Sequence, residues 1–77
     1  MLTPAQCRAA RGLIDMTQRE LASRSGVTHP LIANFERKKR SPRLENLLRI
    51  REALEEAGVE FIPADEHGGP GVRLKHQ

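Results

Sequence analysis

The chain has 77 residues, of which 30% are charged and 3% aromatic, and its formal net charge is +3 at pH 7. This length suits one small domain, and a single cysteine, Cys7, excludes an intrachain disulfide. The amino terminus lacks the basic and then apolar form of a signal peptide, and no apolar run approaches the roughly 20 residues that span a bilayer. We therefore expect a cytoplasmic protein with no membrane role.

The charges are distributed unevenly along the chain. Residues 1–43 carry nine basic and three acidic side chains, a net charge of +6, whereas residues 44–66 carry two basic and seven acidic ones, a net charge of −5. Attraction to phosphates then acts on one part of the molecule and can orient it on a polyanion. Solvated helices also carry such charges, so this asymmetry alone does not decide the function.

The first helix is predicted from Pro4 to about Gly12. Thr3 supplies a capping hydroxyl, Pro4 stands at the first helical position, and Gln6 completes a capping box. Helical spacing predicts the core residues of this helix and of the chain just after it, which are Cys7, Ala10, Leu13 and Met16.

Residues 17–38 predict two short helices joined by a turn. Thr17 and Glu20 form a second capping box, so a helix is expected over 18–25. Gly26 takes a left-handed turn conformation without a side-chain clash and ends that helix. The next helix is expected over 29–37, with Ile32 and Phe35 as its buried stripe.

The start of this second helix leaves two possibilities open. Thr28 is a hydroxyl cap candidate, but Pro30 disfavours helical geometry at His29, so the helix could begin at Pro30 with His29 as its cap. Leu31 is expected toward the more exposed side of the same helix, either as a further apolar contact to DNA or as a half-buried helix residue.

These residues resemble the Cro and phage-repressor type of helix-turn-helix family, also called XRE-like, over roughly residues 2–57. The resemblance rests on Gln18, the spacing Ala22-x-x-x-Gly26-Val27, Ile32 and Phe35-Glu36, followed by a basic run and Ser41-Pro42. It implies a mainly α, lambda-repressor-like DNA-binding domain of four to five helices that binds double-stranded DNA as a two-fold dimer. The second helix of the motif would then lie in the major groove.

One departure from the family pattern concerns the end of the second motif helix, residues 29–37, which is called the reading helix from here on. Many members have Glu-x-Gly there, whereas Glu36-Arg37 is followed by Lys38 in this chain. If Lys38 takes the left-handed conformation, it does so at a cost of roughly 1 kcal/mol relative to glycine.

Side chains near the amino end of the reading helix reach base edges first. Asn34 can pair with N7 and the N6 amine of adenine, and His29 can donate to a guanine acceptor or to a phosphate. Pro30 and Ala33 offer apolar contact to thymine methyl groups. The predicted base contacts are therefore His29, Pro30, Ala33 and Asn34.

Phosphate contacts position a domain without reading sequence. Gln18 resembles the family residue that holds the DNA backbone at the start of the first motif helix, where free N–H groups also favour a phosphate. The basic residues that follow the reading helix are expected to pass along the adjacent strand. The predicted phosphate contacts are Gln18, Arg19, Thr28, Arg37, Lys38, Lys39, Arg40 and Arg43.

A longer helix is predicted from Ser41-Pro42 to Gly58, because a hydroxyl followed by proline repeats the first start signal. Its periodic apolar face would consist of Leu44, Leu47, Leu48, either Ile50 or Arg51, and Leu54. The sequence thus predicts a helix-turn-helix domain over 1–58 and a separate carboxyl-terminal segment over 59–77.

Alternating apolar residues predict two short strands, a hairpin or strand pair, at 59–62 and 72–75 with a loose loop between them. An isolated two-stranded ribbon is marginally stable and needs a covering surface, for which a partner subunit is a candidate. The predicted dimerisation residues are Val59, Phe61, Ile62, Val72 and Leu74. The alternatives are a disordered tail and a strand pair that packs on its own helices.

The sequence as a whole predicts a homodimeric, sequence-specific regulator of transcription, by default a repressor, that reads an inverted repeat with half-sites about one helical turn, ~34 Å, apart. Two alternatives are a DNA-binding antitoxin with a small protein partner and an anti-activator that binds protein. His29, His67 and His76 have no ligand-like spacing, so no metal is expected. We also expect no cofactor and no enzymatic activity.

Overall fold

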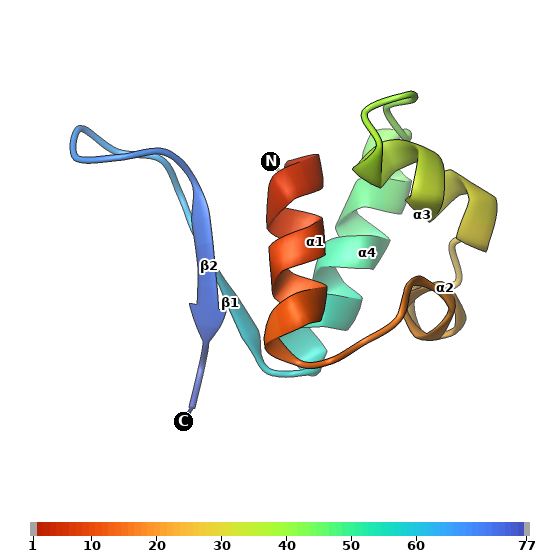
Figure 1. The fold of residues 1–77 in the computed structure, drawn as a ribbon, viewed down its shortest axis with the longest axis horizontal. Helices are drawn as coiled ribbons and strands as arrows, with labels where there is room; N and C mark the ends of the chain where they lie inside the picture. The colour runs from red at the N-terminus through yellow and green to blue at the C-terminus, as the bar shows by residue number, and fades with distance from the viewer. Residues whose placement is uncertain (1, 77) are drawn as a thin grey trace.

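The computed structural model describes residues 2–76, so Met1 and Gln77, the outer limits of the two predicted segments, lie outside it. Within this range four helices precede two strands (Figure 1). The elements are α1 (Pro4–Leu13), α2 (Gln18–Ser25), α3 (His29–Glu36), α4 (Leu44–Glu56), β1 (Val59–Ile62) and β2 (Gly71–Leu74). The chain is therefore a mainly α domain with a carboxyl-terminal strand pair, as predicted.

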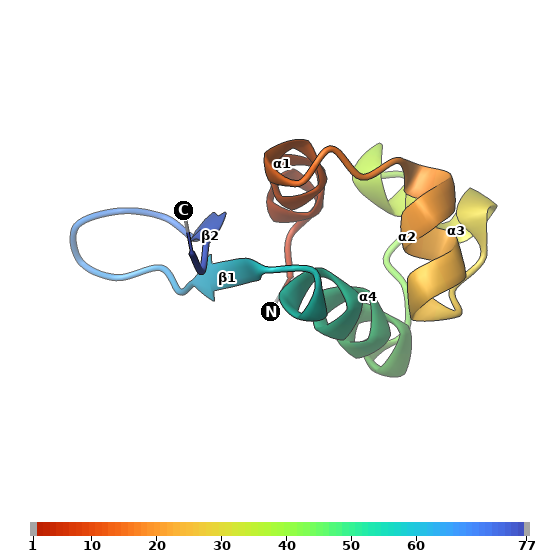
Figure 2. The ribbon, with the colours of Figure 1, turned by 90° about the horizontal axis from the view of Figure 1, so that it is seen from below.

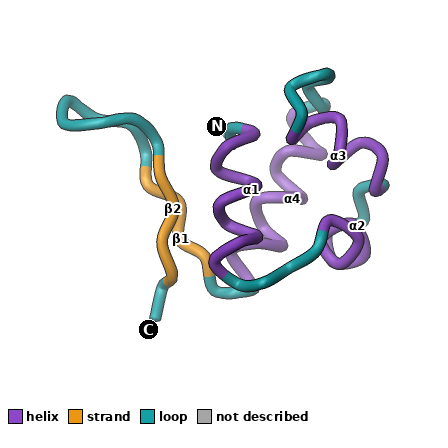
Figure 3. Tube along the Cα trace, in the orientation of Figure 1, coloured by secondary structure: helices purple, strands orange, loops and turns teal. Residues whose placement is uncertain are grey.

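The helices α1 and α4 form the middle of the molecule. The strand pair packs on one side of them, and α2 and α3 lie on the other side (Figures 1 and 2). The strands and α3 consequently lie toward opposite ends of the longest dimension, which is 33 Å. The loop between the strands extends away from the helices (Figure 3).

Both predicted capping boxes are confirmed. The backbone N–H of Gln6 donates to Thr3 Oγ1 at 3.1 Å, and the Thr3 N–H donates to Gln6 Oε1 at 2.9 Å. Thr17 and Glu20 make the same pair of bonds at 3.0 and 3.1 Å at the start of α2. Four backbone donors at two helix starts are satisfied in this way, and both starts fall where the sequence places them.

Each of the two helices of the motif ends next to a residue in the left-handed conformation. Gly26 closes α2 with φ 77°, as expected for glycine. Lys38 follows α3 with φ 62°, and the N–H groups of Lys38 and Lys39 bond to the carbonyls of Phe35 and Asn34 at 3.0 and 2.9 Å. This pair of bonds is a Schellman motif with lysine at the position that glycine usually occupies. Lys38 therefore does take the left-handed conformation, with the cost that this carries for a residue with a Cβ atom.

Helix α3 starts at His29. Thr28 is its cap residue, although the Thr28 hydroxyl makes no capping hydrogen bond. The alternative start at Pro30 is therefore wrong. Leu31 is half-buried and packs against the core, which is the second of the two possibilities given for it.

The start of α4 differs from the prediction. The helix begins at Leu44 and not at Pro42, because Arg43 still has extended backbone angles (φ −61°, ψ 154°) and its carbonyl accepts the first helical bonds. Pro42 is instead buried in the preceding loop. The buried side of α4 consists of Leu47, Ile50, Ala53 and Leu54. Leu44 and Leu48, 57% and 44% exposed, do not belong to it, and Leu13 of α1 is likewise exposed at 41%.

The strand pair is antiparallel, with Val59 opposite Leu74 and Phe61 opposite Val72. Its apolar face packs on α1 and α4, so Val59 is fully buried and Phe61 is 9% exposed. Of the possibilities left open by the sequence, packing on the chain's own helices is the one observed. One hydrophobic cluster joins both predicted segments, and β2 starts one residue earlier than expected.

Candidate nucleic-acid interface

One face of α3 points away from the core. Pro30, Ala33, Asn34 and Arg37 recur at the helical spacing i, i+3, i+4 and i+7. Ile32 and Phe35 occupy the opposite, buried side. Pro30 and Arg37 are exposed, and Ala33 and Asn34 are half-buried. The structure thus brings together the side chains predicted to contact bases, with His29 at the amino end of the same helix.

The basic loop, residues 37–43, connects α3 to α4. Its cationic side chains are all exposed. The side chains of Arg19 and Thr28, beside the helix starts, are exposed as well. Among residues 2–76 no carboxylate lies within ion-pair distance of these cations. The cations without an ion-pair partner in this range are Arg19, Arg37, Lys38, Lys39, Arg40 and Arg43. Unpaired cations beside an exposed helix face are free to contact phosphates.

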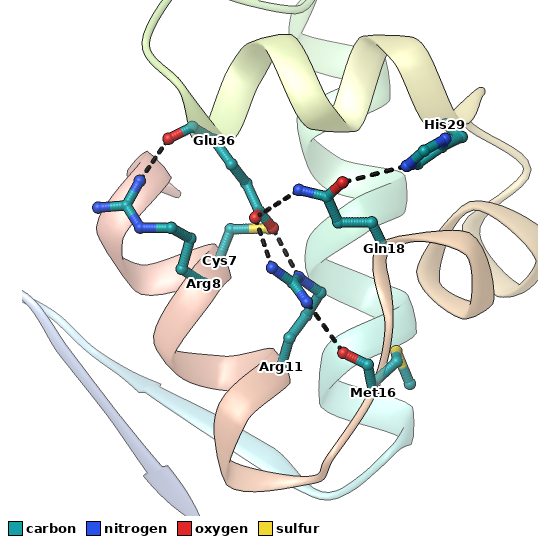
Figure 4. Close-up of polar contacts among 7 residues, drawn as sticks. All are labelled: Cys7, Arg8, Arg11, Met16, Gln18, His29 and Glu36. Atoms are coloured by element: carbon teal, nitrogen blue, oxygen red, sulfur yellow. Dashed lines mark hydrogen bonds and ion pairs between the residues drawn. The ribbon is translucent and has the colours of Figure 1, made fainter.

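Behind α3 lies a network of hydrogen bonds centred on Glu36, which is only 3% exposed (Figure 4). Arg11 of α1 donates to Oε1 at 2.6 Å and to Oε2 at 2.7 Å. Cys7 Sγ donates to Oε2 at 3.1 Å, and Gln18 Nε2 donates to Oε1 at 3.0 Å. Arg8 bonds to the Glu36 backbone carbonyl. This Glu36 network ties α1, α2 and α3 together.

The electrostatics of the network keep the carboxylate ionised. Burial opposes the charge, but hydrogen bonds from Arg11, Gln18 and Cys7 outweigh it and hold the pKa of Glu36 below its ordinary value. Burial and the bond to Glu36 raise the pKa of the Cys7 thiol. A buried thiol with a raised pKa is a poor nucleophile, so Cys7 acts as a small core residue.

Gln18 lies between the network and the amino end of α3. Its Oε1 contacts His29 Nε2 at 3.1 Å while its Nε2 bonds to Glu36 (Figure 4). Both ends of the side-chain amide are therefore engaged inside the protein. Nε2 carries two N–H donors and Glu36 takes one of them, so this arrangement does not exclude a phosphate contact at Gln18.

The pairing of Glu36 with Arg11 was not predicted from the sequence. A signal for them is nevertheless present, because Glu36 follows Ile32 by four positions and Arg11 follows Cys7 by four positions. Opposite charges thus stand on the buried stripes of two helices, where an unpaired charge is strongly unfavourable.

Two further observations describe residues 2–76. No three His, Cys, Asp or Glu side chains in this range gather closely enough to hold a metal ion. No helix there has both the length and the apolar character needed to cross a membrane.

Comparison with known proteins agrees with this architecture. A family model described as helix-turn-helix matches residues 8–61. An HTH-type transcriptional regulator of Sinorhizobium fredii, y4dL, is 38% identical over 68 residues, which cover 88% of this chain and 33% of that protein. The chain therefore spans about a third of the length of this relative. From the matched family model, and from the two helices about Gly26 that it covers, the chain belongs to the XRE-type helix-turn-helix family of DNA-binding transcriptional regulators.

Proposed function

We propose that this protein is a sequence-specific, homodimeric repressor that binds an inverted repeat in double-stranded DNA. The observation that carries the proposal is the outward face of α3, with Pro30, Ala33, Asn34 and Arg37, next to the exposed and unpaired basic loop. Side chains that could contact base edges and side chains that could contact phosphates thus share one side of the molecule.

In this proposal α3 enters the major groove, and Asn34 pairs with an adenine through its carboxamide. Pro30 and Ala33 supply apolar contact to thymine methyl groups. The cations of the basic loop, together with Arg19 and Thr28, hold the flanking phosphates. Repression follows when the bound dimer blocks access of polymerase to the same DNA.

The proposal is tested by selecting bound duplexes from a random pool with the wild type and the Asn34→Ala variant. We expect an inverted repeat whose preference relaxes at one position in the variant. A good bidentate contact carries about 1–3 kcal/mol of discrimination. The matched control is Lys39→Ala, which should weaken binding to all sequences alike and reduce the salt dependence by about one unit of slope.

The outcomes separate this proposal from its alternatives. If the folded protein enriches no sequence, the sequence-specific repressor is wrong, and a protein-binding role becomes the better explanation. Repression itself is tested with a reporter gene placed behind the selected site, where expression should fall when the wild type is present and recover with Asn34→Ala.

A further inference from the structure

His29 is the residue at which the Glu36 network reaches the proposed DNA-binding surface. It is half-buried, it is the first residue of α3, and one of its ring nitrogens, Nε2, contacts Gln18 Oε1 at 3.1 Å. Figure 4 shows the chain of contacts running from Arg11 through Glu36 and Gln18 to His29. The inference below rests on the proposed function, because it concerns what His29 recognises on DNA.

The first step is that Glu36 can only accept hydrogen bonds. Its carboxylate is ionised, since the bonds from Arg11, Gln18 and Cys7 lower its pKa despite burial. Gln18 must therefore turn its NH₂ group toward Glu36, as the 3.0 Å contact between Gln18 Nε2 and Glu36 Oε1 shows. The flipped amide would place two acceptor oxygens against each other in a buried position.

The second step follows from the first. With its NH₂ group held by Glu36, Gln18 presents its carbonyl oxygen to His29, and that oxygen only accepts. His29 must then carry its proton on Nε2 to make this bond. In a neutral imidazole the other nitrogen, Nδ1, is consequently an acceptor with a free lone pair. No hydrogen bond to Nδ1 occurs within residues 2–76.

We propose that the Glu36 network fixes the tautomer of His29, so that neutral His29 reads a hydrogen-bond donor on a base through Nδ1. The major groove offers two such donors, the N4 amine of cytosine and the N6 amine of adenine. Guanine presents only N7 and O6 acceptors there, and a phosphate also only accepts. In this proposal His29 accepts from one of these amines, whereas donation to guanine or to a phosphate would need the proton on Nδ1.

Gln18 and Glu36 act in this proposal as positioning residues and need not touch the base. Glu36 orients the amide of Gln18, and the amide determines which ring nitrogen of His29 is protonated. The sequence preference at one base pair is thus set by a carboxylate buried behind the reading helix.

The first test measures the tautomer without DNA. The wild-type protein is labelled with ¹⁵N at histidine and studied by NMR at about pH 8.5, where imidazole is ordinarily neutral. The two ring nitrogens then show whether each is of the N–H or the lone-pair type. We expect His29 to be protonated on Nε2 alone, whereas His67, whose exposed side chain is 85% accessible, serves as the internal reference. A His29 protonated on Nδ1, or a mixture, overturns the inference.

The second test measures base preference at the same pH with the wild type, His29→Ala, Gln18→Met and the matched control Arg19→Met. The wild type should prefer one base pair at the position that relaxes in His29→Ala. Because every base pair carries one of the two amines in the major groove, the purine of that pair is then replaced with its 7-deaza analogue, which lacks only the N7 acceptor, and wild-type binding should not weaken. Gln18→Met should reduce that preference about five-fold, the effect of one hydrogen bond of about 1 kcal/mol, and leave the position assigned to Asn34 unchanged. Arg19→Met should weaken all sites equally.

The results distinguish the inference from the function beneath it. Weaker wild-type binding to the 7-deaza duplex, or equal effects of Gln18→Met and Arg19→Met, overturns the reading through Nδ1. If no sequence is enriched by the wild type, the proposed function fails and the reading fails with it. The NMR measurement still reports the hydrogen-bond chain in that case, because it needs no DNA.

Discussion

Arg11 and Glu36, on α1 and α3, are joined by two parallel contacts of 2.6 and 2.7 Å between guanidinium and carboxylate. Arg11 also donates to the Met16 carbonyl at 3.0 Å. One side chain thus links the first helix, the connection to α2 and the reading helix. The orientation of α3 on the core depends on this pair as well as on apolar packing.

Replacement of Arg11 with methionine leaves the Glu36 carboxylate buried without its cation. Removal of one partner of a buried ion pair costs about 3–5 kcal/mol. Arg11 is 19% exposed, so we expect the lower end of this range, measured as the free energy of unfolding in urea. The double variant Arg11→Met/Glu36→Leu should recover part of the loss, and the control Arg8→Met should lose less. A double variant no more stable than Arg11→Met would contradict the prediction.

Acid should destabilise the protein through Glu36. Its folded pKa lies below the ordinary 4.5, so its contribution to stability is complete above pH 4.5 and is lost as the pH falls through the folded pKa. We expect stability to decline less steeply below pH 4.5 in Glu36→Gln than in the wild type, measured by denaturant unfolding at a series of pH values. Glu60→Gln, which removes an exposed carboxylate paired with Arg73, should retain most of the decline. Equal slopes for the wild type and Glu36→Gln would show that another group dominates.

Lys38 allows backbone strain and charge to be separated. Its φ of 62° is unfavourable for a residue with a Cβ atom, so Lys38→Gly should raise the free energy of unfolding by roughly 1 kcal/mol. Lys38→Ala removes the same charge but keeps the strain and should gain little stability. Both variants should lose DNA affinity by the same factor if the ammonium group contacts a phosphate. Thermal unfolding and binding titrations measure the two effects, and a stability loss in Lys38→Gly would argue against the strain.

Local signals predicted much of the fold. The threonine boxes at residues 3–6 and 17–20, and the glycine at 26, act within one helical turn, so the sequence places them correctly. The helix start predicted at Ser41-Pro42 was wrong, because the same local signal occurs here in a loop whose proline is buried by tertiary packing. The Glu36 network joins residues 18 to 29 positions apart, and no local rule specifies such a pairing. The candidate DNA-contacting side chains were predictable as types, but the orientation of His29 required the network.

The strand pair belongs to the core, and its removal should unfold the chain. Val59 is fully buried and Phe61 is 9% exposed, with the Arg51 guanidinium 5.2 Å from the ring centroid. Phe61→Ala should therefore cost about 3 kcal/mol. Truncation after Gly58 should give an unfolded chain and not a folded monomer, as judged by circular dichroism. The exposed Leu74→Ala serves as the control and should cost less than 1 kcal/mol, about the usual surface effect. A stable truncated chain would show that the strands are dispensable.

If two copies of the chain join as proposed, charge substitution can locate the contact between them. Val59 and Phe61 face this chain's own helices, so a contact through the strands has Leu74, 37% exposed, and Ile62 as its apolar residues. Leu44 and Leu48 on α4 are more exposed, at 57% and 44%. If the strands form the predicted dimer, Leu74→Lys should lower the sedimentation coefficient and Leu48→Lys should leave it unchanged. The reverse result would place the contact on α4.

The position of the strands also bears on the arrangement of operator DNA. Because the strands and α3 lie toward opposite ends of a 33 Å molecule, two copies joined strand to strand would hold their reading helices well apart. Half-sites two helical turns apart, about 68 Å, would then suit the dimer better than a single turn of about 34 Å. A contact near the start of α4, beside the end of α3, would restore the shorter spacing. The number of base pairs between the arms of a selected operator therefore distinguishes a dimer joined through the strands from one joined near the start of α4.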